Sequence, residues 1–177
     1  MPEWTPYRIK LPAASSSRPG DAAILDIVRH VVHVPEARRI LEDGVLRAGL
    51  VYDESRLNRS RTCVTWLSAN TWGPGSIYGN VEFCFAWEDV IRDRNVYWVE
   101  TMTAYSPSAY RLLITDRDLD GSRHVTPYDP SSDRGPLRER DGKWYWNPNY
   151  TSEFMVDTDL RLRRCSEFGF IEPCLSG

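Results

Sequence analysis

The sequence predicts an α+β domain that is rich in short strands and has few helices. Short runs of β-branched and aromatic residues recur along the chain, and segments rich in glycine and proline separate them. Only one segment places apolar residues at helical spacing between a helix start signal and a stop signal. We therefore expect several strands for each helix.

Length and composition are typical of one soluble domain. The 177 residues suffice for a single sizeable core, and the composition, 41% hydrophobic and 27% charged, is that of an ordinary globular protein. Residues 1–20 contain four prolines and a run of three serines, which predict an irregular N-terminal arm. Residues 21–177 are expected to form the domain itself.

The first predicted elements are a strand and a short helix. Residues 27–32 are mostly β-branched and predict a buried strand. Pro35 suits the first turn of a helix, and Gly44 suits the position just after its end. Between them, three apolar residues recur at helical spacing: Ala37, Ile40 and Leu41.

Later strands are expected from further β-branched and aromatic runs. They lie at residues 64–68, 81–87, 96–103, 110–115 and 154–156. Residues 52–61 are polar without a period and predict a loop, and residues 72–79 predict a turn-rich connection. Residues 117–151 contain seven glycines and prolines and predict a long loop, which in a compact domain is more often functional than not.

Charge and targeting signals restrict the function classes. The net charge of −3 does not by itself demand a nucleic-acid partner, so such binding would need a local patch. Two arginine groups are candidates, although each could equally be a solvated face: Arg56, Arg59 and Arg61, and Arg161, Arg163 and Arg164. No apolar run is long enough to span a membrane and no secretory signal is visible, so we expect a cytoplasmic protein.

Cysteines and histidines do not predict a metal site. The four cysteines are scattered, and we expect reduced thiols, although an even number would also permit two disulfides. His30 and His33 are the only close pair of potential ligands. On an extended strand, residues three apart point to opposite faces, which is poor geometry for one ion.

The segment from His30 to Leu46 resembles the opening of the ADP-ribosyltransferase fold. There a strand histidine stands ten residues before the Ile-Leu of a short helix that closes on an acidic residue and glycine, as His30 does before Ile40. The resemblance implies that His30 contacts the adenosine-side ribose of NAD. Two residues after this histidine the family commonly has Thr or Ser, and this chain has Val32. A version of the opening with a second histidine three residues later, here His33, is most similar to that of the DarT toxins, which modify DNA bases.

Two further pieces carry the same resemblance. Trp66-Leu67-Ser68, followed by Tyr78-Gly79 before a strand, is similar to the family's strand-serine element and its nicotinamide-stacking tyrosine. Tyr78 is therefore the expected stacking residue, with Trp72 as an alternative and Ser68 supporting the NAD pocket. Glu153 follows a long loop and begins a strand, as the family's catalytic glutamate does. A carboxylate there would stabilise the oxocarbenium-like sugar.

The resemblance implies a fold of two small packed antiparallel or mixed sheets, NAD as co-substrate, and a bacterial toxin or phage-defence effector that an antitoxin could restrain. The arginines at positions 56, 59 and 61 lie where DarT-like enzymes place a residue that reaches toward the NAD phosphates or the acceptor, and of the three we choose Arg59. Thr151 stands where arginine-modifying relatives carry a second acid, which argues against an arginine acceptor.

The aromatic run at 144–150 predicts a nucleic-acid acceptor, single-stranded DNA or RNA, rather than protein. Exposed aromatics stack unpaired bases and amides read base edges, so we choose Trp146, Asn147 and Tyr150 as acceptor-binding residues. The same run could instead be a hydrophobic plug that ties the loop to the core. Other functions left open are protein modification, NAD hydrolysis, RNA 2′-phosphotransfer and a non-catalytic binding module. The role of residues 88–140 is not predicted.

Overall fold

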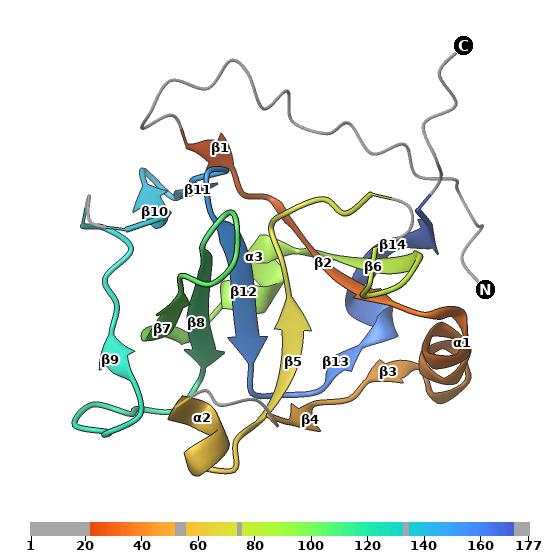
Figure 1. The fold of residues 1–177 in the computed structure, drawn as a ribbon, viewed down its shortest axis with the longest axis horizontal. Helices are drawn as coiled ribbons and strands as arrows, with labels where there is room; N and C mark the ends of the chain where they lie inside the picture. Colours follow the sequence, from red (N-terminus) through yellow and green to blue (C-terminus); the bar gives the residue numbers. More distant parts are fainter. Residues whose placement is uncertain (1–21, 52–55, 74–75, 133–134, 172–177) are drawn as a thin grey trace.

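The computed structural model describes residues 22–51, 56–73, 76–132 and 135–171 (Figure 1). The expected N-terminal arm at 1–20 lies outside the described residues. The described part is α+β, with three α-helices, one short 3₁₀ helix and several small sheets, as the sequence predicted. Within it, no helix is both long and apolar enough to cross a membrane.

The largest sheet has six strands and is mixed. β12 pairs with β8 in parallel and with β5 in an antiparallel manner, so it lies near the middle of the sheet. The spatial order is β4 (Gly49–Leu50), β5 (Cys63–Leu67), β12 (Thr151–Val156), β8 (Ala109–Thr115), β7 (Asn95–Met102) and β9 (Thr126–Pro127).

A second, antiparallel sheet consists of β14 (Cys165–Phe170), β6 (Val81–Ala86) and β2 (Ile27–Val32). One backbone bridge joins it to the six-stranded sheet: Arg29 and Ser68 exchange two N–H···O bonds of 2.8 Å. β2 and β5 diverge from this bridge, and both line the space between the two sheets (Figure 1).

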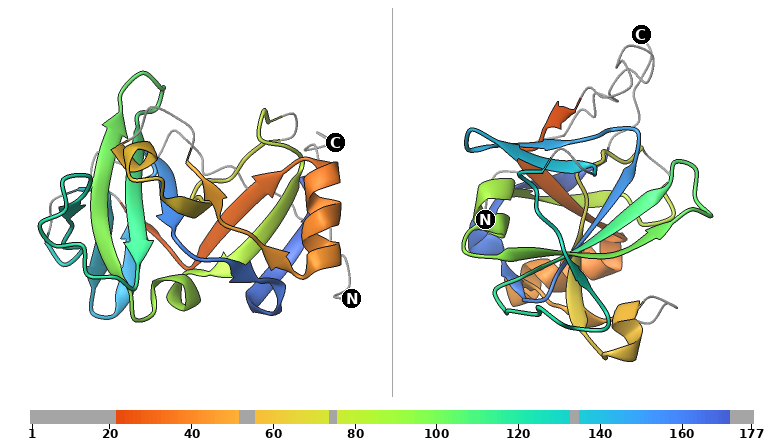
Figure 2. Two further views of the ribbon diagram at one scale, coloured as in Figure 1. Left: turned by 90° about the horizontal axis from the view of Figure 1, so that it is seen from below. Right: turned by 90° about the vertical axis from the view of Figure 1, so that its left-hand side faces the viewer.

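Short strands and helices complete the fold. A three-stranded sheet contains β1 (Ala23–Ile24), β11 (Lys143–Trp146) and β10 (Leu137–Arg140), and β3 (Val45–Leu46) pairs with β13 (Leu160–Arg161). The helices are α1 (Val34–Asp43), α2 (Arg56–Arg59), α3 (Trp87–Ile91) and the 3₁₀ helix η1 (Leu162–Arg164). α1 lies at the opposite end of the molecule from β7 and β8 (Figure 2).

The predicted strand–helix opening is confirmed. β2 has the predicted bounds, and α1 begins after His33 with proline in its first turn. Gly44 ends the helix with φ of 66°, the left-handed conformation that favours glycine, and its N–H bonds the Ile40 carbonyl. The strands predicted at 64–68, 81–87, 96–103, 110–115 and 154–156 are each present within a few residues of those bounds.

Three expectations need correction. Residues 56–59 form α2 rather than a loop, because Leu57 turns inward and is 2% exposed. The strand expected to run to position 87 ends at Ala86, where α3 begins with the buried Trp87. The loop expected at 117–151 contains β9 and the β10–β11 hairpin, and β12 already begins at Thr151.

Apolar side chains cover both faces of the six-stranded sheet. On β12, Phe154 belongs to the main core together with Trp87, and the two ring centroids lie 4.8 Å apart. The next residue, Met155, points to the opposite face and belongs to a second cluster with Leu113 and Leu57. Since side chains alternate along a strand, Glu153 lies on the same face as Met155. The two cores therefore hold β12 from both sides and fix the position of Glu153.

Candidate active site

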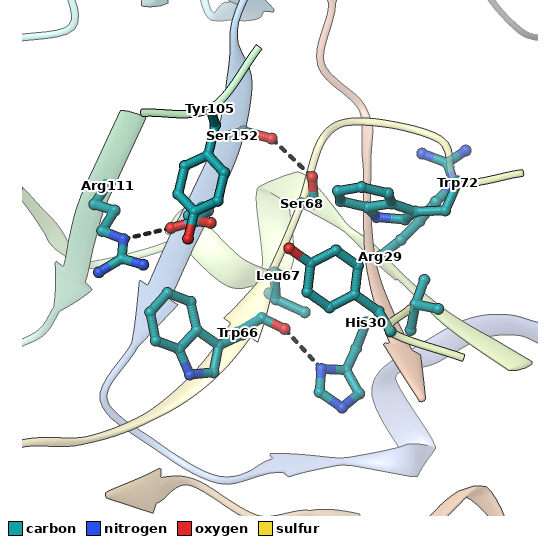
Figure 3. A pocket seen from close by; sticks show the side chains of 12 residues that line it. Arg29, His30, Trp66, Leu67, Ser68, Trp72, Tyr105, Arg111 and Ser152 are labelled. Carbon is teal, nitrogen blue, oxygen red and sulfur yellow. Dashed lines mark hydrogen bonds and ion pairs between the residues drawn. The ribbon is translucent and has the colours of Figure 1, made fainter. Parts of the chain in front are cut away.

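A cavity of about 390 Å³ lies where β2 and β5 diverge, within the size range of small-molecule sites. Figure 3 shows the side chains that line it. Four residues singled out from the sequence, although far apart along the chain, all line this cavity: His30, Ser68, Tyr78 and Glu153.

His30 is held in one orientation by a backbone carbonyl. Its Nδ1 lies 2.7 Å from the carbonyl oxygen of Trp66, as Figure 3 shows. A carbonyl only accepts, so the proton of the neutral ring is on Nδ1 and Nε2 is an acceptor. Burial lowers the pKa of His30, and the hydrogen bond to Trp66 opposes this in part. The ring is thus neutral at pH 7 and suited to accept a hydrogen bond from a ligand hydroxyl.

Ser68 belongs to a hydrogen-bond network centred on Asn70. The Asn70 side-chain oxygen accepts from the Ser68 hydroxyl at 3.0 Å and from both the hydroxyl and the N–H of Ser152 at 2.9 and 2.7 Å. The Ser152 hydroxyl in turn accepts from the N–H of Ala69 at 2.6 Å. This network joins the end of β5 to the start of β12 and so positions the neighbouring Glu153.

Glu153 shares a guanidinium with another carboxylate. Arg111 on β8 donates from Nε to Glu153 and from Nη1 to Glu100 on β7, the latter at 3.2 Å. The Arg111 side chain is 6% exposed and lies 5.3 Å from the ring centroid of Trp66. Charge-assisted bonds on one side and the aromatic ring on the other hold the guanidinium, and with it the Glu153 carboxylate, in place.

Tyr78 projects from the turn-rich connection between β5 and β6. It is 45% exposed, and its ring meets that of Trp72 edge to face with centroids 4.8 Å apart. Burial raises the pKa of the Tyr78 hydroxyl, and the charge of Glu153 raises it further. The hydroxyl is therefore protonated at neutral pH, and both aromatic residues remain candidates for stacking.

Glycine and histidine fix this connection against β2. Gly79 has φ of 126°, and a Cβ there would lie 2.0 Å from the backbone carbon of Val32, so no larger residue fits. The His33 Nε2 lies 3.2 Å from the Ile77 carbonyl oxygen and donates to it. His33 thus supports the loop that carries Tyr78.

Arg59 is not brought into the cavity. It is exposed on α2, and it is not among the lining residues. The arginines that line the cavity are Arg29, which lies 3.7 Å from the buried Glu82, and Arg111. The sequence contains no local signal that Arg29 and Arg111, rather than Arg59, would line the cavity. These two arginines reach it only because β2 and β8 pair with other strands.

The aromatic run before Glu153 serves mainly as a plug. Trp146 is 3% exposed, donates from Nε1 to the Tyr150 carbonyl at 3.0 Å and packs edge to face on Phe154. Tyr150 packs against Tyr110 with centroids 4.5 Å apart, and the Asn147 side chain accepts from a neighbouring backbone N–H. Burial removes the Trp146 ring from solvent, which corrects its expected role as an exposed stacking residue, whereas Asn147 and Tyr150 are partly exposed. None of the three chosen residues lines the cavity.

Sequence reasoning missed Asn70, Ser152, Arg111, Trp66 and Tyr105 as site residues. Tyr105, from the connection between β7 and β8, is 50% exposed and also lines the cavity (Figure 3). A local signal existed for Asn70 alone, because the Ser68 hydroxyl accepts from the Asn70 N–H at 3.1 Å, and serine side chains commonly bond the backbone two residues further on.

Metal-ligand chemistry is not evident in the described residues, where no group of three or more His, Cys, Asp or Glu side chains could hold an ion. Cys63, Cys84 and Cys165 are free cysteines, and burial raises the pKa of the Cys84 thiol to about 12. Cys174 lies outside the described residues.

Comparison with models of protein families, with curated proteins and with solved structures finds no match to this chain. The functional argument therefore depends on the geometry of the cavity and on the chemistry of the side chains that line it.

Proposed function

We propose that this protein is an ADP-ribosyltransferase that uses NAD as co-substrate and transfers ADP-ribose to a base of a nucleic acid. The observation that carries the proposal is that residues from three separate segments of the chain line the same cavity. Three segments were singled out because each resembles a different element of the family, and their residues line one cavity: His30, Ser68, Tyr78 and Glu153. Independent chance resemblances would not be expected to meet in space.

The arrangement of the sheets supports the same proposal. A mixed sheet and an antiparallel sheet lie side by side, joined at the Arg29–Ser68 bridge, with few helices around them. This agrees with the expectation of two small packed sheets that accompanied the resemblance to the ADP-ribosyltransferase fold. The DarT-like members are the proposed relatives, and a role as a toxin or defence effector belongs to the proposal.

In the proposed complex, each half of NAD meets a suitable partner. The Nε2 acceptor of His30 receives a hydrogen bond from a ribose hydroxyl of the adenosine half. The flat cationic nicotinamide ring stacks on Tyr78, beside Trp72. Glu153 lies at the reacting ribose, where its negative charge stabilises the positive charge that develops on the sugar.

The proposed reaction is a substitution at C1′ of the ribose that moves the ADP-ribosyl group from nicotinamide to the acceptor. The bond between nicotinamide N1 and ribose C1′ breaks, and its electron pair leaves with nicotinamide, which becomes neutral. A new bond forms between C1′ and a nucleophilic atom of the acceptor base. The proton lost by that atom is taken by the carboxylate of Glu153, which acts as general base.

The test uses NAD labelled on its adenosine half and separate pools of single-stranded DNA, RNA and cell protein. The wild-type protein is expected to release nicotinamide and to label one nucleic-acid pool. Glu153→Gln, which keeps the size and one hydrogen-bond acceptor, is expected to lower the rate by about 10²- to 10⁴-fold. The matched control is Glu88→Gln, because Glu88 is exposed on α3 away from the cavity.

Each other outcome identifies a different function. Label on protein alone indicates a protein-modifying enzyme, and nicotinamide release without any label indicates NAD hydrolysis. Unchanged nucleic-acid binding in Glu153→Gln together with no nicotinamide release from the wild-type protein would favour a binding module and contradict the enzyme proposal.

A further inference from the structure

A second cavity, of about 590 Å³, adjoins the first. The two share four residues as a common wall: Trp72, Tyr78, Tyr105 and Glu153. The remainder of the second cavity is lined by the loop around Ile77, by the connection between β7 and β8, and by Ala109 and Thr151 at the starts of β8 and β12. Glu153 is therefore accessible from two sides.

We propose that this second cavity is the acceptor site and that it binds the flat, uncharged ring of an acceptor base while the phosphates stay outside. The inference rests on the proposed function, because it assigns the first cavity to NAD. A group that stabilises the reacting sugar and also takes the acceptor proton must reach both substrates. Glu153 meets this requirement because it belongs to both cavities.

Aromatic and apolar side chains line the second cavity. Three of the exposed large hydrophobic residues of the described chain lie around it: Ile77 at 83% exposure, Tyr105 at 50% and Tyr78 at 45%. Single exposed apolar residues are normal, whereas a cluster beside a reactive group indicates a binding surface. Exposed aromatic faces suit the stacking of a planar ring.

Charge decides which part of a nucleotide the cavity can bind. Among the described residues that line it, none carries a positive charge, and Glu153 carries a negative one. A phosphate would therefore be repelled, while a neutral ring would not. Proteins that neutralise phosphates bind more weakly as salt rises, because counterions are released. Binding to this cavity is thus expected to depend little on salt and to need only an unpaired base.

The binding test uses the full-length protein with isotope-labelled isoleucine methyl groups and four separate probes: adenosine, guanosine, cytidine and thymidine. One nucleoside is expected to shift the Ile77 methyl upfield by the ring current of a stacked base. Ile24, 66% exposed on β1 and absent from the lining of both cavities, is the internal control and should not shift. The Ile77 methyl resonance is assigned as the one that is missing from the spectrum of Ile77→Ala. The Kd of the protein for that nucleoside should change less than about twofold between about 50 and 200 mM salt.

The activity test compares Ile77→Ala with the matched control Ile24→Ala. Truncation of Ile77 is expected to raise the KM for the acceptor about tenfold, because apolar contact with the ring is lost. Ile24→Ala should keep the wild-type KM. A second variant, Ser106→Trp, fills the cavity from an exposed position and is expected to abolish transfer. Nicotinamide release without acceptor, measured on the wild-type protein, reports separately on the proposed NAD chemistry.

Five results would overturn the inference. A wild-type acceptor KM in both Ile77→Ala and Ser106→Trp would place the acceptor elsewhere. Binding only to polynucleotides with a steep salt dependence would mean that phosphates are recognised, and a shift caused by a tyrosine-containing peptide but by no nucleoside would indicate a protein acceptor. If nicotinamide is released but no base is labelled, this inference fails while NAD cleavage stands. If no nicotinamide is released, the proposed function fails and the acceptor site with it.

Discussion

Arg111 and Glu153 lie side by side on the parallel strands β8 and β12, and the guanidinium donates from Nε to the carboxylate. The same guanidinium donates to Glu100 on β7, so one cation bridges two carboxylates across three neighbouring strands. The Arg111 side chain is 6% exposed, and its positive charge offsets the repulsion between the largely buried carboxylates of Glu100 and Glu153. Four predictions follow from this relationship and from the elements around it.

Replacement of Arg111 by lysine is expected to keep the charge but lose the fork that serves both carboxylates. The lysine ammonium is compact and lacks the planar guanidinium, so it cannot bond both carboxylates and lie over the Trp66 ring at the same time. We expect kcat to fall about tenfold with a small change in thermal stability. Arg111→Met, which leaves two uncompensated carboxylates, is expected to destabilise the fold by about 3–5 kcal/mol, measured by urea unfolding.

The control for this pair is Arg117→Lys. Arg117 pairs with Asp157 at 2.7 Å, but its side chain is 54% exposed and does not line the cavity. Its replacement should leave kcat unchanged. Equal loss of activity in both lysine variants would show that the Arg111 fork has no special role.

Gly79→Ala is expected to displace the loop that carries Tyr78. The added Cβ would lie 2.0 Å from the backbone of Val32, and the glycine has a positive φ, so the loop must move as a whole. NAD binding measured by calorimetry should weaken by at least about tenfold. Gly73→Ala is the matched control in the same loop, because its Cβ would meet nothing within 4 Å. A Gly79→Ala variant that binds NAD like wild type would contradict this role of the loop.

Asn70→Ala is expected to destabilise the junction of β5 and β12. It removes the oxygen that accepts from Ser68 and Ser152, and partly buried donors left without partners cost about 1–3 kcal/mol. Asn70→Asp keeps the acceptor oxygen for Ser68 and Ser152 but replaces the donor to the Tyr150 carbonyl with a second oxygen, so it should lose only part of the network and its effect should be smaller. Denaturant unfolding and kcat are measured for both, with the exposed Asn149→Ala as control. Equal stability of all three variants would argue against the network.

The stability of the fold is expected to decrease in mild acid because of His30. Burial lowers the pKa of this histidine in the folded state from the usual 6.5, so below that pH the unfolded chain binds more protons than the folded one. The stabilisation is fully present above about pH 6.5 and is lost as pH falls through the lowered pKa. The free energy of unfolding should therefore fall between about pH 7.5 and pH 5.

The variant that tests this is His30→Asn, whose amide can replace Nδ1 as donor to the Trp66 carbonyl without titrating. It should flatten the pH dependence of unfolding, whereas His124→Asn should retain it. An unchanged slope in His30→Asn would assign the acid sensitivity to other groups.

The sequence determined the elements whose signals are local. Pro35 and Gly44 delimit α1, and the β-branched run at 27–32 forms β2, because a fixed proline φ, a left-handed glycine and a β-branched side chain act within a few residues. The β10–β11 hairpin had such a signal as well: Asp141 and Gly142 both have positive φ, as a tight hairpin turn requires. That turn was missed among the surrounding glycines and prolines.

The resemblance of three segments to the ADP-ribosyltransferase fold also singled out His30, Tyr78 and Glu153, which the tertiary structure then brings to one cavity. Other features depended on the tertiary structure alone. The five-residue helix α3 carries no period of its own, and it forms where Trp87 enters the main core.

Only the tertiary structure decided which side chains surround Glu153. Arg111 stands 42 positions before it in the chain, and the two meet because β8 and β12 pair in parallel in one register. The choice of strand partner and register depends on burying Phe154 and Met155 on opposite faces of the sheet at once. That is a property of the whole packed sheet, and no segment of the sequence carries it alone.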